Sequence, residues 1–394
     1  MEFETLYARL DAELDKLQAE GALRALPAGK FKGRYVKVFG RKLLNLSSND
    51  YLGLSSDIVL QSEFLSRLCK SEKFLMSSSS SRLLTGNFPQ YGELELLIAD
   101  MYRKESALVF SSGYHANSGI LPAVTDSRSL VLADKLVHAS IIDGLRLSKA
   151  KVMRYAHNSY EHLHALLEKY APLHTEVFIV TESIFSMDGD TADLRLLAEL
   201  KKEFRNVYLY VDEAHAFGVR GENGLGLSEE CGVSDEIDFL VGTFGKAAAS
   251  QGAFVVCRQD IRDYLVNKMR TLIYTTALPP VNVLWTIEVL KHFDCLEKKR
   301  RHLDVLSSFV RKAVADKGYG NISSSQIVPV VAGSNDAAIK LSGIMRETGF
   351  YVLPLRPPTV PEGTSRLRLS LTAAITMEDA AMIMNALPEK SDIA

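Results

Sequence analysis

Tryptophan and cysteine are scarce in this sequence of 394 residues, and neither sign of charge is in excess. The four cysteines are Cys69, Cys231, Cys257 and Cys295. They stand far apart without a CxxC pair, so the sequence indicates neither a disulfide framework nor a zinc knuckle. His162 and His164 lie two apart on an expected helix and face different directions, so no metal site is expected. The 46 Lys and Arg against 48 Asp and Glu give a net charge of -2, which excludes a global basic field that would recruit nucleic acid.

Long hydrophobic runs are also missing. No apolar stretch approaches the roughly 18–20 residues needed to cross a bilayer. The first residues are acidic and mixed, unlike a cationic signal peptide with an apolar centre. A soluble, cytoplasmic protein without a membrane partner is therefore expected.

Apolar residues, by contrast, make up 47% of the chain, which is enough for a large packed core. The length predicts more than one lobe. We expect an N-terminal helix and arm over residues 1–50, a large domain over 51–280 and a small domain over 281–394. The basic segment 30–42 is either a solvated hairpin or a strip that attracts an anion, and the run Lys298–Arg301 is expected to be a solvated helix face.

Short apolar runs recur between residues 107 and 257, separated by gaps long enough for helices. The predicted strands are 107–110, 129–134, 176–183, 207–213, 239–244 and 252–257, and 191–204 is a predicted helix. Apolar strands alternating with helices predict a parallel sheet covered on both faces. Such sheets bind ligands just beyond the carboxyl ends of their strands.

The last hundred residues have a different pattern. A strand over 327–333 is followed by a helix from Asn335 to about Thr348, and two further strands are expected before a helix that opens at Thr376 with a capping box. This pattern predicts a smaller α+β lobe.

Four predicted strand ends carry residues that could take part in catalysis or ligand binding. One delivers Asp212 and then His215, and a carboxylate at the end of a buried strand requires a partner. A second delivers Lys246 among Gly and Ala, where loss of solvent favours the neutral amine that forms a Schiff base. A third runs into Ser111, Ser112 and Gly113, which suit a phosphate, and a fourth leads to His138, which could stack on a flat ring.

Each of these residues alone has an ordinary structural explanation, such as a helix cap or a surface lysine. Together they supply an amine for an aldehyde, an acid for a pyridinium nitrogen, an imidazole for a phenolate and a phosphate cradle. Those are the requirements of pyridoxal 5'-phosphate (PLP).

The chain resembles the α-oxoamine synthase family of fold-type-I PLP enzymes over about residues 20–385. The matching motifs, in order, are NLSSNDYLGLS (45–55), SRLLTGN (81–87), VTESIFSMDGD (180–190), VDEAHAFGVRGENGLG (211–226), TFGKA (243–247), YTTALPP (274–280) and LRPPTVPEGTSRLRLSLT (355–372). The resemblance implies an α/β fold, with a mainly parallel seven-stranded sheet between helices in the large domain and a smaller α+β C-terminal domain.

The resemblance also assigns roles to residues. It implies that Lys246 binds the cofactor aldehyde, Asp212 the ring nitrogen and His215 the phenolic oxygen, while His138 stacks on the ring. The remaining cofactor contacts that it implies are Ser112, Gly113, Tyr114, Glu182, Ser186, Thr243 and Thr276. The last of these would reach the cofactor of a neighbouring subunit, which implies a homodimer with shared active sites. Asn49 and Arg366 match contacts to the substrate carboxylate, and Arg24 is a further candidate for substrate binding.

One position departs from the family pattern. Where the family has a histidine before its Leu-Glu pair, this sequence has Tyr91, so fine substrate selection is in doubt while the cofactor chemistry is not.

The segment 355–361 most resembles the 8-amino-7-oxononanoate synthase branch of the family. That branch condenses L-alanine with a pimeloyl thioester, of CoA or of an acyl carrier protein, in biotin synthesis. Alternatives are a 2-amino-3-ketobutyrate CoA ligase, a 5-aminolevulinate synthase or an enzyme like serine palmitoyltransferase. A nucleotide-binding protein is disfavoured because LVGTFGKA lacks the first Gly of a P-loop. A catalytically dead relative that acts as a binding module is disfavoured because Lys246 and Asp212 are both present.

Overall fold

The computed structural model describes residues 5–38, 40–70, 75–320 and 322–393, which form two compact units. The central unit comprises residues 49–186 and 190–302, and the terminal unit comprises residues 1–48, 187–189 and 303–394. Residues 281–302 belong by their contacts to the central unit. The three-part domain division drawn from the sequence stays a prediction.

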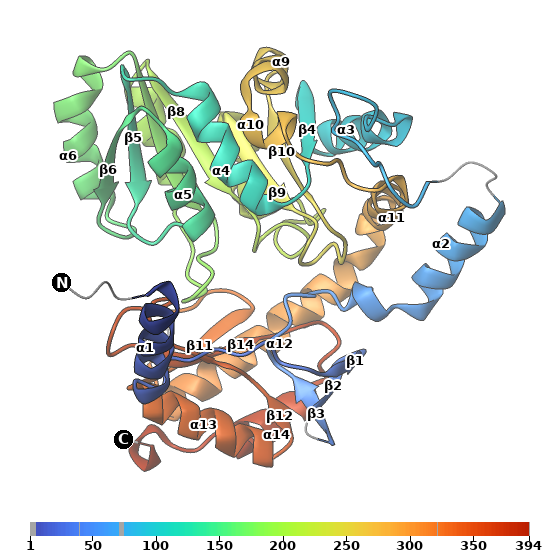
Figure 1. The fold of residues 1–394 in the computed structure, drawn as a ribbon, viewed down its shortest axis with the longest axis vertical. Helices are drawn as coiled ribbons and strands as arrows, with labels where there is room; N and C mark the ends of the chain where they lie inside the picture. The colour runs from blue at the N-terminus through green and yellow to red at the C-terminus, as the bar shows by residue number, and fades with distance from the viewer. Residues whose placement is uncertain (1–4, 39, 71–74, 321, 394) are drawn as a thin grey trace. The chain divides into compact units, whose positions relative to one another are not determined.

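The central unit is an α/β sandwich (Figure 1). Its strands are β4 (Ser106–Phe110), β5 (Ser129–Asp134), β6 (Lys151–Tyr155), β7 (Glu176–Glu182), β8 (Val207–Asp212), β9 (Phe239–Thr243) and β10 (Ala253–Cys257). Its helices are α2 (Ile58–Lys70), α3 (Pro89–Tyr102), α4 (Gly113–Val124), α5 (Ala139–Leu147), α6 (Tyr160–Tyr170), α7 (Leu194–Glu203), α8 (Leu227–Cys231), α9 (Gln259–Lys268), α10 (Arg270–Ile273) and α11 (Pro280–Lys291).

The seven strands form one sheet in the order β4-β10-β9-β8-β7-β5-β6. β10 pairs antiparallel with both of its neighbours, and the other strand pairs of the sheet are parallel. The strands predicted from apolar runs are confirmed, and β4, β5, β9 and β10 are buried along their whole length, as a sheet covered on both faces requires. The mainly parallel seven-stranded sheet is therefore confirmed.

α4 and α5 pack closely on each other beside this sheet (Figure 1). A Cβ atom at Gly144 of α5 would lie 2.5 Å from the carbonyl oxygen of Asn117 on α4. Glycine is thus the residue that permits this approach of the two helices. The contact fixes the middle of α4, where Asn117 is buried.

In its described residues, the terminal unit has two small sheets and three helices that lie wholly within it. They are β1 (Lys30–Lys32), β2 (Tyr35–Val38), β3 (Arg41–Asn45) and β12 (Phe350–Tyr351) in one sheet, β11 (Ile327–Gly333), β14 (Ser365–Ser370) and β13 (Pro354–Leu355) in the other, and the helices α1 (Leu6–Ala19), α13 (Asn335–Glu347) and α14 (Met377–Ala386). The boundary between the units falls within α12 (Glu297–Asp316). This unit confirms the expected smaller α+β lobe.

Two expectations about the surface have different outcomes. The basic segment 30–42 contains β1, β2 and the first two residues of β3, with Lys30 and Lys32 exposed, as a solvated hairpin would be. The expectation of a solvated face at Lys298–Arg301 is wrong for Arg300, which is buried. Its guanidinium donates to the carbonyls of Phe293, at 2.9 Å, and Glu222, at 2.6 Å, so backbone oxygens replace water around the charge.

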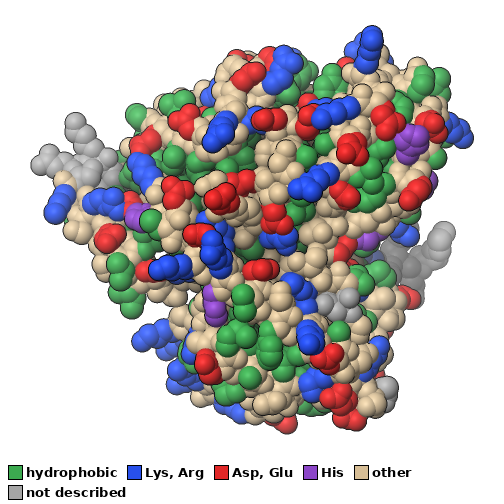
Figure 2. Space-filling view, turned by 180° about the vertical axis from the view of Figure 1, so that it is seen from behind, with side chains coloured by type: hydrophobic (Ala, Val, Ile, Leu, Met, Phe, Trp, Pro, Cys, Tyr) green, Lys and Arg blue, Asp and Glu red, His purple; other side chains and the backbone are tan. Residues whose placement is uncertain are grey.

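Charge is evenly spread on the face that Figure 2 shows, where cations and carboxylates are interspersed. Within the described ranges, no helix combines the length and apolar character needed to span a bilayer.

The predicted capping box at the start of α14 is confirmed. The Thr376 hydroxyl accepts from the Asp379 backbone N–H at 3.1 Å, and the Asp379 carboxylate accepts from the Thr376 N–H at 2.9 Å. We predict that Thr376→Ala lowers the free energy of unfolding by about 1 kcal/mol, because one end of the helix loses an acceptor. Urea unfolding measures this loss, and Thr376→Ser, which keeps the hydroxyl, should unfold like the parent. Equal destabilisation by both variants would contradict the capping role.

Candidate active site

Most of the predicted site residues gather at the carboxyl ends of the central strands. His138 follows β5, Glu182 ends β7, Asp212 ends β8 and Lys246 follows β9. These strands are parallel, so the four residues lie at one edge of the sheet, where such sheets bind ligands.

Asp212 is buried, and both of its carboxylate oxygens have donors. The Asn117 amide donates to Oδ2 at 2.7 Å, and the Ala214 backbone N–H donates to Oδ1 at 2.8 Å. The other side of the Asn117 amide accepts from the Tyr210 hydroxyl at 2.7 Å. Asp212 is thus held by neutral donors, which leave its negative charge available to a cation.

Lys246 belongs to a second hydrogen-bonded chain. Its Nζ lies 2.9 Å from Nε2 of His215, and Nδ1 of His215 lies 2.7 Å from the Tyr51 hydroxyl. That hydroxyl donates to Oδ1 of Asn49 at 3.1 Å. In one tautomer the imidazole donates from Nδ1 to the Tyr51 hydroxyl and accepts at Nε2 from Lys246, so the chain can support the lysine amine.

His138 offers an exposed ring at the start of α5. Its Nδ1 lies 2.7 Å from the Ser140 hydroxyl, which in turn accepts from Asn117 at 3.0 Å. Loss of solvent on its inner side lowers the pKa of His138, against an opposing effect of the Asp212 charge. A neutral ring with one open face suits stacking on a flat cofactor.

Glu182 is paired in register with Asp212 on the neighbouring strand. Burial, with the Asp212 charge beside it, raises the pKa of Glu182 well above its usual range. Oε1 of Glu182 is buried without a partner among the described residues. A neutral acid with an unsatisfied oxygen at the site edge is available to hydrogen-bond a bound ligand.

The amino end of α4 follows β4 and presents hydroxyls and backbone N–H groups. Ser112 caps the helix, and Gly113 begins it, with Thr243 of β9 close by. The Thr243 hydroxyl donates to the Gly252 carbonyl at 3.0 Å and accepts from the Gly245 N–H at 3.2 Å. Tyr114 is exposed and donates to Asp143 at 2.5 Å. A helix amino terminus of this kind favours an anionic group.

The remaining candidates of the central unit lie in loops. Ser186 is half-buried in the turn after β7, and Thr276 is exposed in the segment before α11, with its carbonyl accepting from Ser111 at 3.0 Å.

Tyr91, the departure from the family pattern, is buried in α3 and holds the segment between Thr276 and α11 through the backbone of Leu278. Its hydroxyl accepts from the Leu278 N–H at 2.6 Å and lies 3.3 Å from the Leu278 carbonyl.

Arg24 and Arg366 belong to the terminal unit. Arg366 is buried on β14, where its Nε donates to the Thr364 carbonyl at 3.0 Å and its Nη1 is ion-paired with Asp188. Arg24 donates to the Thr359 hydroxyl at 2.7 Å. Partial burial, and then the positive charge of Arg24, lower the pKa of the neighbouring Arg356.

Sequence reasoning missed three residues that organise the site: Tyr51, Asn117 and His157. Tyr51 lies within the matching motif 45–55 and Asn117 lies five residues after Ser112, and a hydroxyl or amide in an apolar context was the available signal. His157 carried no local signal, because its partners are 23 and 33 residues away along the chain.

His157 lies between two carboxylates. Its Nδ1 is 2.8 Å from Asp134 at the end of β5, and its Nε2 is 2.8 Å from Asp190. Partial burial opposes the charged ring, but the hydrogen bonds and charges of the two acids prevail and raise the pKa of His157 to about 10. A protonated His157 therefore joins β5 to the loop that carries Ser186.

Comparison with known proteins identifies this arrangement. Residues 41–387 match the family model described as aminotransferase class I and II. A protein of Haemophilus influenzae named "Putative 8-amino-7-oxononanoate synthase" is 54% identical over 367 residues, which is 93% of this chain and 96% of the relative. A relative of the same name from Neisseria meningitidis serogroup A is 53% identical over the same shares of the two chains.

The chain belongs to the aminotransferase class I and II family.

Two solved structures are similar to most or nearly all of the chain. Serine palmitoyltransferase of Sphingomonas wittichii has a TM-score of 0.89 at 29% identity and covers 99% of this chain and 98% of its own. 8-Amino-7-oxononanoate synthase of Francisella tularensis has a TM-score of 0.75 at 29% identity and covers 89% of this chain and 98% of its own. The α-oxoamine synthase resemblance and the fold-type-I architecture are thus confirmed.

The expectation of PLP-dependent acyltransferase chemistry is confirmed at the level of the family. Solved serine palmitoyltransferases similar to this chain carry PLP in their names. The donor set of the central unit fits PLP, since it combines a lysine amine, a buried carboxylate, an open imidazole face and a helix amino terminus. The unsatisfied Oε1 of Glu182 is the buried polar atom that a bound ligand would satisfy.

We predict a pH-dependent contribution of His157 to stability. The pKa of His157 is raised in the folded protein, so its ion pairs contribute fully below the unfolded pKa near 6.5 and are lost as pH rises through about 10. Between pH 6 and pH 10 the stability difference between the parent and His157→Gln should shrink by about 2 kcal/mol after allowance for solvent screening.

Urea unfolding at both pH values measures this difference. His174→Gln is the matched control, because the His174 ring is half-buried beside a backbone carbonyl. A difference that is independent of pH would show that His157 is not charged in the folded protein.

Proposed function

We propose that this chain condenses L-alanine with a pimeloyl thioester to give 8-amino-7-oxononanoate, carbon dioxide and the free thiol, as a step in biotin synthesis. The observation that carries the proposal is the 54% identity over 93% of the chain to relatives that bear the name of this activity. Retention of the predicted site residues at one sheet edge supports it. The acyl carrier would be CoA or an acyl carrier protein, and we place the enzyme in the cytoplasm.

The residues at the sheet edge would hold PLP. Lys246 would bind its aldehyde, Asp212 its ring nitrogen and His215 its phenolic oxygen, with His138 on the ring face and Glu182 nearby. Ser112, Gly113, Tyr114, Ser186 and Thr243 would surround the phosphate and ring. When bound, PLP supplies an electron-accepting ring that makes an amino acid easier to deprotonate at its α-carbon.

Lys246, supported by His215, would transfer the α-proton of the amino acid. Nζ of Lys246 is the amine positioned to take the α-proton of the amino acid and later to return one. The contact of 2.9 Å to His215 gives that amine an acceptor while it is free. Because Asp212 is bound only by Asn117 and a backbone N–H in the described structure, its charge can keep a ring nitrogen protonated.

The amino acid carboxylate would be bound by Arg366 and Asn49. The Arg366 guanidinium is already oriented from two sides, by the Thr364 carbonyl and by the carboxylate of Asp188. A guanidinium fixed in this way loses little freedom when it binds a planar carboxylate through two hydrogen bonds.

Arg24 would bind the acyl substrate. The Thr359 hydroxyl accepts a hydrogen bond from its guanidinium. Burial, and then the like charge of Arg24, lower the pKa of Arg356, so the two guanidiniums lie close together. Two guanidiniums in proximity favour an anion, and the distal carboxylate of a pimeloyl chain is the anion we propose. The exposed lysines of segment 30–42 would favour approach of an anionic carrier.

We further propose a homodimer in which Thr276 reaches the cofactor of the partner subunit. Thr276 is exposed, and the nearby segments 75–76 and 83–84 leave Leu75, Met76, Leu83 and Leu84 exposed as well. Exposed apolar side chains in one region are typical of a protein interface.

A second candidate is a serine-using palmitoyltransferase activity. Its support is the higher TM-score of serine palmitoyltransferase, 0.89 against 0.75 for 8-amino-7-oxononanoate synthase. Both solved structures are 29% identical to this chain, so sequence identity to them does not separate the two activities.

A substrate panel tests the proposal. Alanine, glycine and serine are each combined with pimeloyl, heptanoyl, succinyl, acetyl and palmitoyl thioesters, and products are identified by mass. We predict that alanine with the pimeloyl thioester is turned over fastest, and that heptanoyl, which lacks the distal carboxylate, is at least tenfold slower. Asp212→Ala should keep its fold and lose at least 100-fold in kcat, and Lys246→Ala should be inactive. Preference for serine and palmitoyl thioester would establish the second candidate instead.

Asp188 gives a sharper test of the amino acid site. We predict that Asp188→Ala raises KM for alanine about tenfold and leaves KM for the thioester unchanged, because Arg366 loses the charge that orients it. Asp188→Asn keeps an acceptor and should have a smaller effect. Steady-state kinetics with each substrate varied in turn measure both constants. Equal rises in the two KM values would point to general damage rather than to a role of Asp188 in positioning Arg366.

A further inference from the structure

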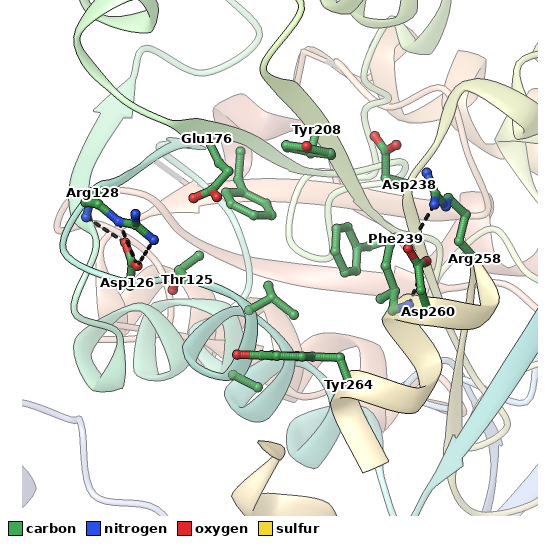
Figure 3. A pocket seen from close by; sticks show the side chains of 14 residues that line it. Thr125, Asp126, Arg128, Glu176, Tyr208, Asp238, Phe239, Arg258, Asp260 and Tyr264 are labelled. Carbon is green, nitrogen blue, oxygen red and sulfur yellow. Dashed lines mark hydrogen bonds and ion pairs between the residues drawn. The ribbon is translucent and has the colours of Figure 1, made fainter. Parts of the chain in front are cut away.

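A cavity lies in the central unit at the amino ends of the parallel strands β7, β8 and β9 (Figure 3). Its volume is about 550 Å³, and it is lined by residues at or just before the starts of β7, β8 and β9, by the end of α4 and by α9. That volume lies within the range of small-molecule sites, roughly 300–1,000 Å³. The site residues described above stand at the other ends of these strands, so this cavity is separate from the candidate active site.

Aromatic rings form much of the cavity wall. Phe178 of β7 and Tyr208 of β8 are paired in register and stack with centroids 5.4 Å apart at 28°. Phe239 lies 6.0 Å from Phe178. Tyr264 of α9 is half exposed, and Figure 3 shows it across the cavity from Tyr208. A cavity wall built of aromatic rings favours a flat aromatic ligand.

Carboxylates outnumber cations around this wall. Four acids and two arginines line the cavity, a net formal charge of -2. Both arginines are already bound by acids close to them in the chain: Arg128 by Asp126 and Arg258 by Asp260, each at 2.8 Å. An anionic ligand would therefore meet excess negative charge and no uncommitted guanidinium.

Glu176 is the carboxylate that remains for a ligand. Asp238 is ion-paired with Lys201 at 2.7 Å. Glu176 accepts from two neutral hydroxyls, Ser129 at 2.9 Å and Thr175 at 3.2 Å, and no ion pair involves it in the part of the chain that the structure describes. Glu176 and Phe178 are two apart on β7 and so share one face of the strand. A cation bonded to Glu176 would lie beside the Phe178 ring.

We propose that this cavity binds a small planar aromatic cation, an arylamidine, with its ring against the aromatic wall that includes Tyr208 and Tyr264 and its positive group on Glu176. The combination of ring stacking and a charge-assisted hydrogen bond selects this ligand class over neutral aromatics and over anions. The site is independent of the function proposed above, because none of its residues takes part in the chemistry at the other ends of the strands.

Benzamidine binding tests the proposal. Benzoate is an anionic control of nearly the same shape, and benzamide is the neutral control. Calorimetry or ligand-observed NMR on the full chain should show saturable benzamidine binding and at least tenfold weaker binding of benzoate. Glu176→Gln, which keeps acceptors for Ser129 and Thr175, should weaken benzamidine about tenfold, and Tyr264→Leu should weaken it several-fold. Glu199→Gln, an exposed acid on α7, should leave binding unchanged.

Binding of benzoate as tight as that of benzamidine would overturn the proposal, as would benzamidine affinity unaffected by both Glu176→Gln and Tyr264→Leu. Absence of saturable benzamidine binding would overturn it too. Melting temperatures of the variants, measured without ligand, separate loss of the site from loss of the fold.

Discussion

A carboxylate at the end of a buried strand is the constraint on which the site depends. The apolar strand β8 delivers Asp212 into the interior, where a lone charge would be costly. The structure meets that cost with the Asn117 amide and a backbone N–H, both neutral. Neutral donors stabilise the carboxylate charge without neutralising it, whereas an arginine at the same place would neutralise it in an ion pair.

The same requirement explains how the helices are placed. Asn117 can reach Asp212 only because α4 lies close to the sheet, and α4 in turn packs on α5 at Gly144. Asn117 also donates to Ser140, which holds the His138 ring. One amide therefore connects the acid and the stacking imidazole. The neighbouring acid, Glu182, becomes the neutral member of the pair, because burial, and then the Asp212 charge, raise its pKa.

The sequence predicted the central sheet well, because fully buried strands leave continuous apolar runs that need no knowledge of their neighbours. It also predicted which residues follow those strands, since that depends on chain order alone. The hydrogen bonds between Asn117 and Asp212, or between Tyr51 and His215, join residues 95 and 164 positions apart, and no local pattern records such pairs. Arg300 was mistaken for a solvated residue because a run of cations on a helix looks the same whether its neighbours are water or backbone carbonyls.

Tyr91 stands where the resemblance to the family leads one to expect a histidine. Its hydroxyl holds both backbone groups of Leu278, and burial raises its pKa to about 12. An imidazole in that place would gain or lose a proton close to neutrality, and its grip on the backbone would change with it. The phenol keeps one protonation state from acidic to strongly alkaline solution. The backbone of Leu278, two residues after Thr276, is therefore held in the same way across that range of pH.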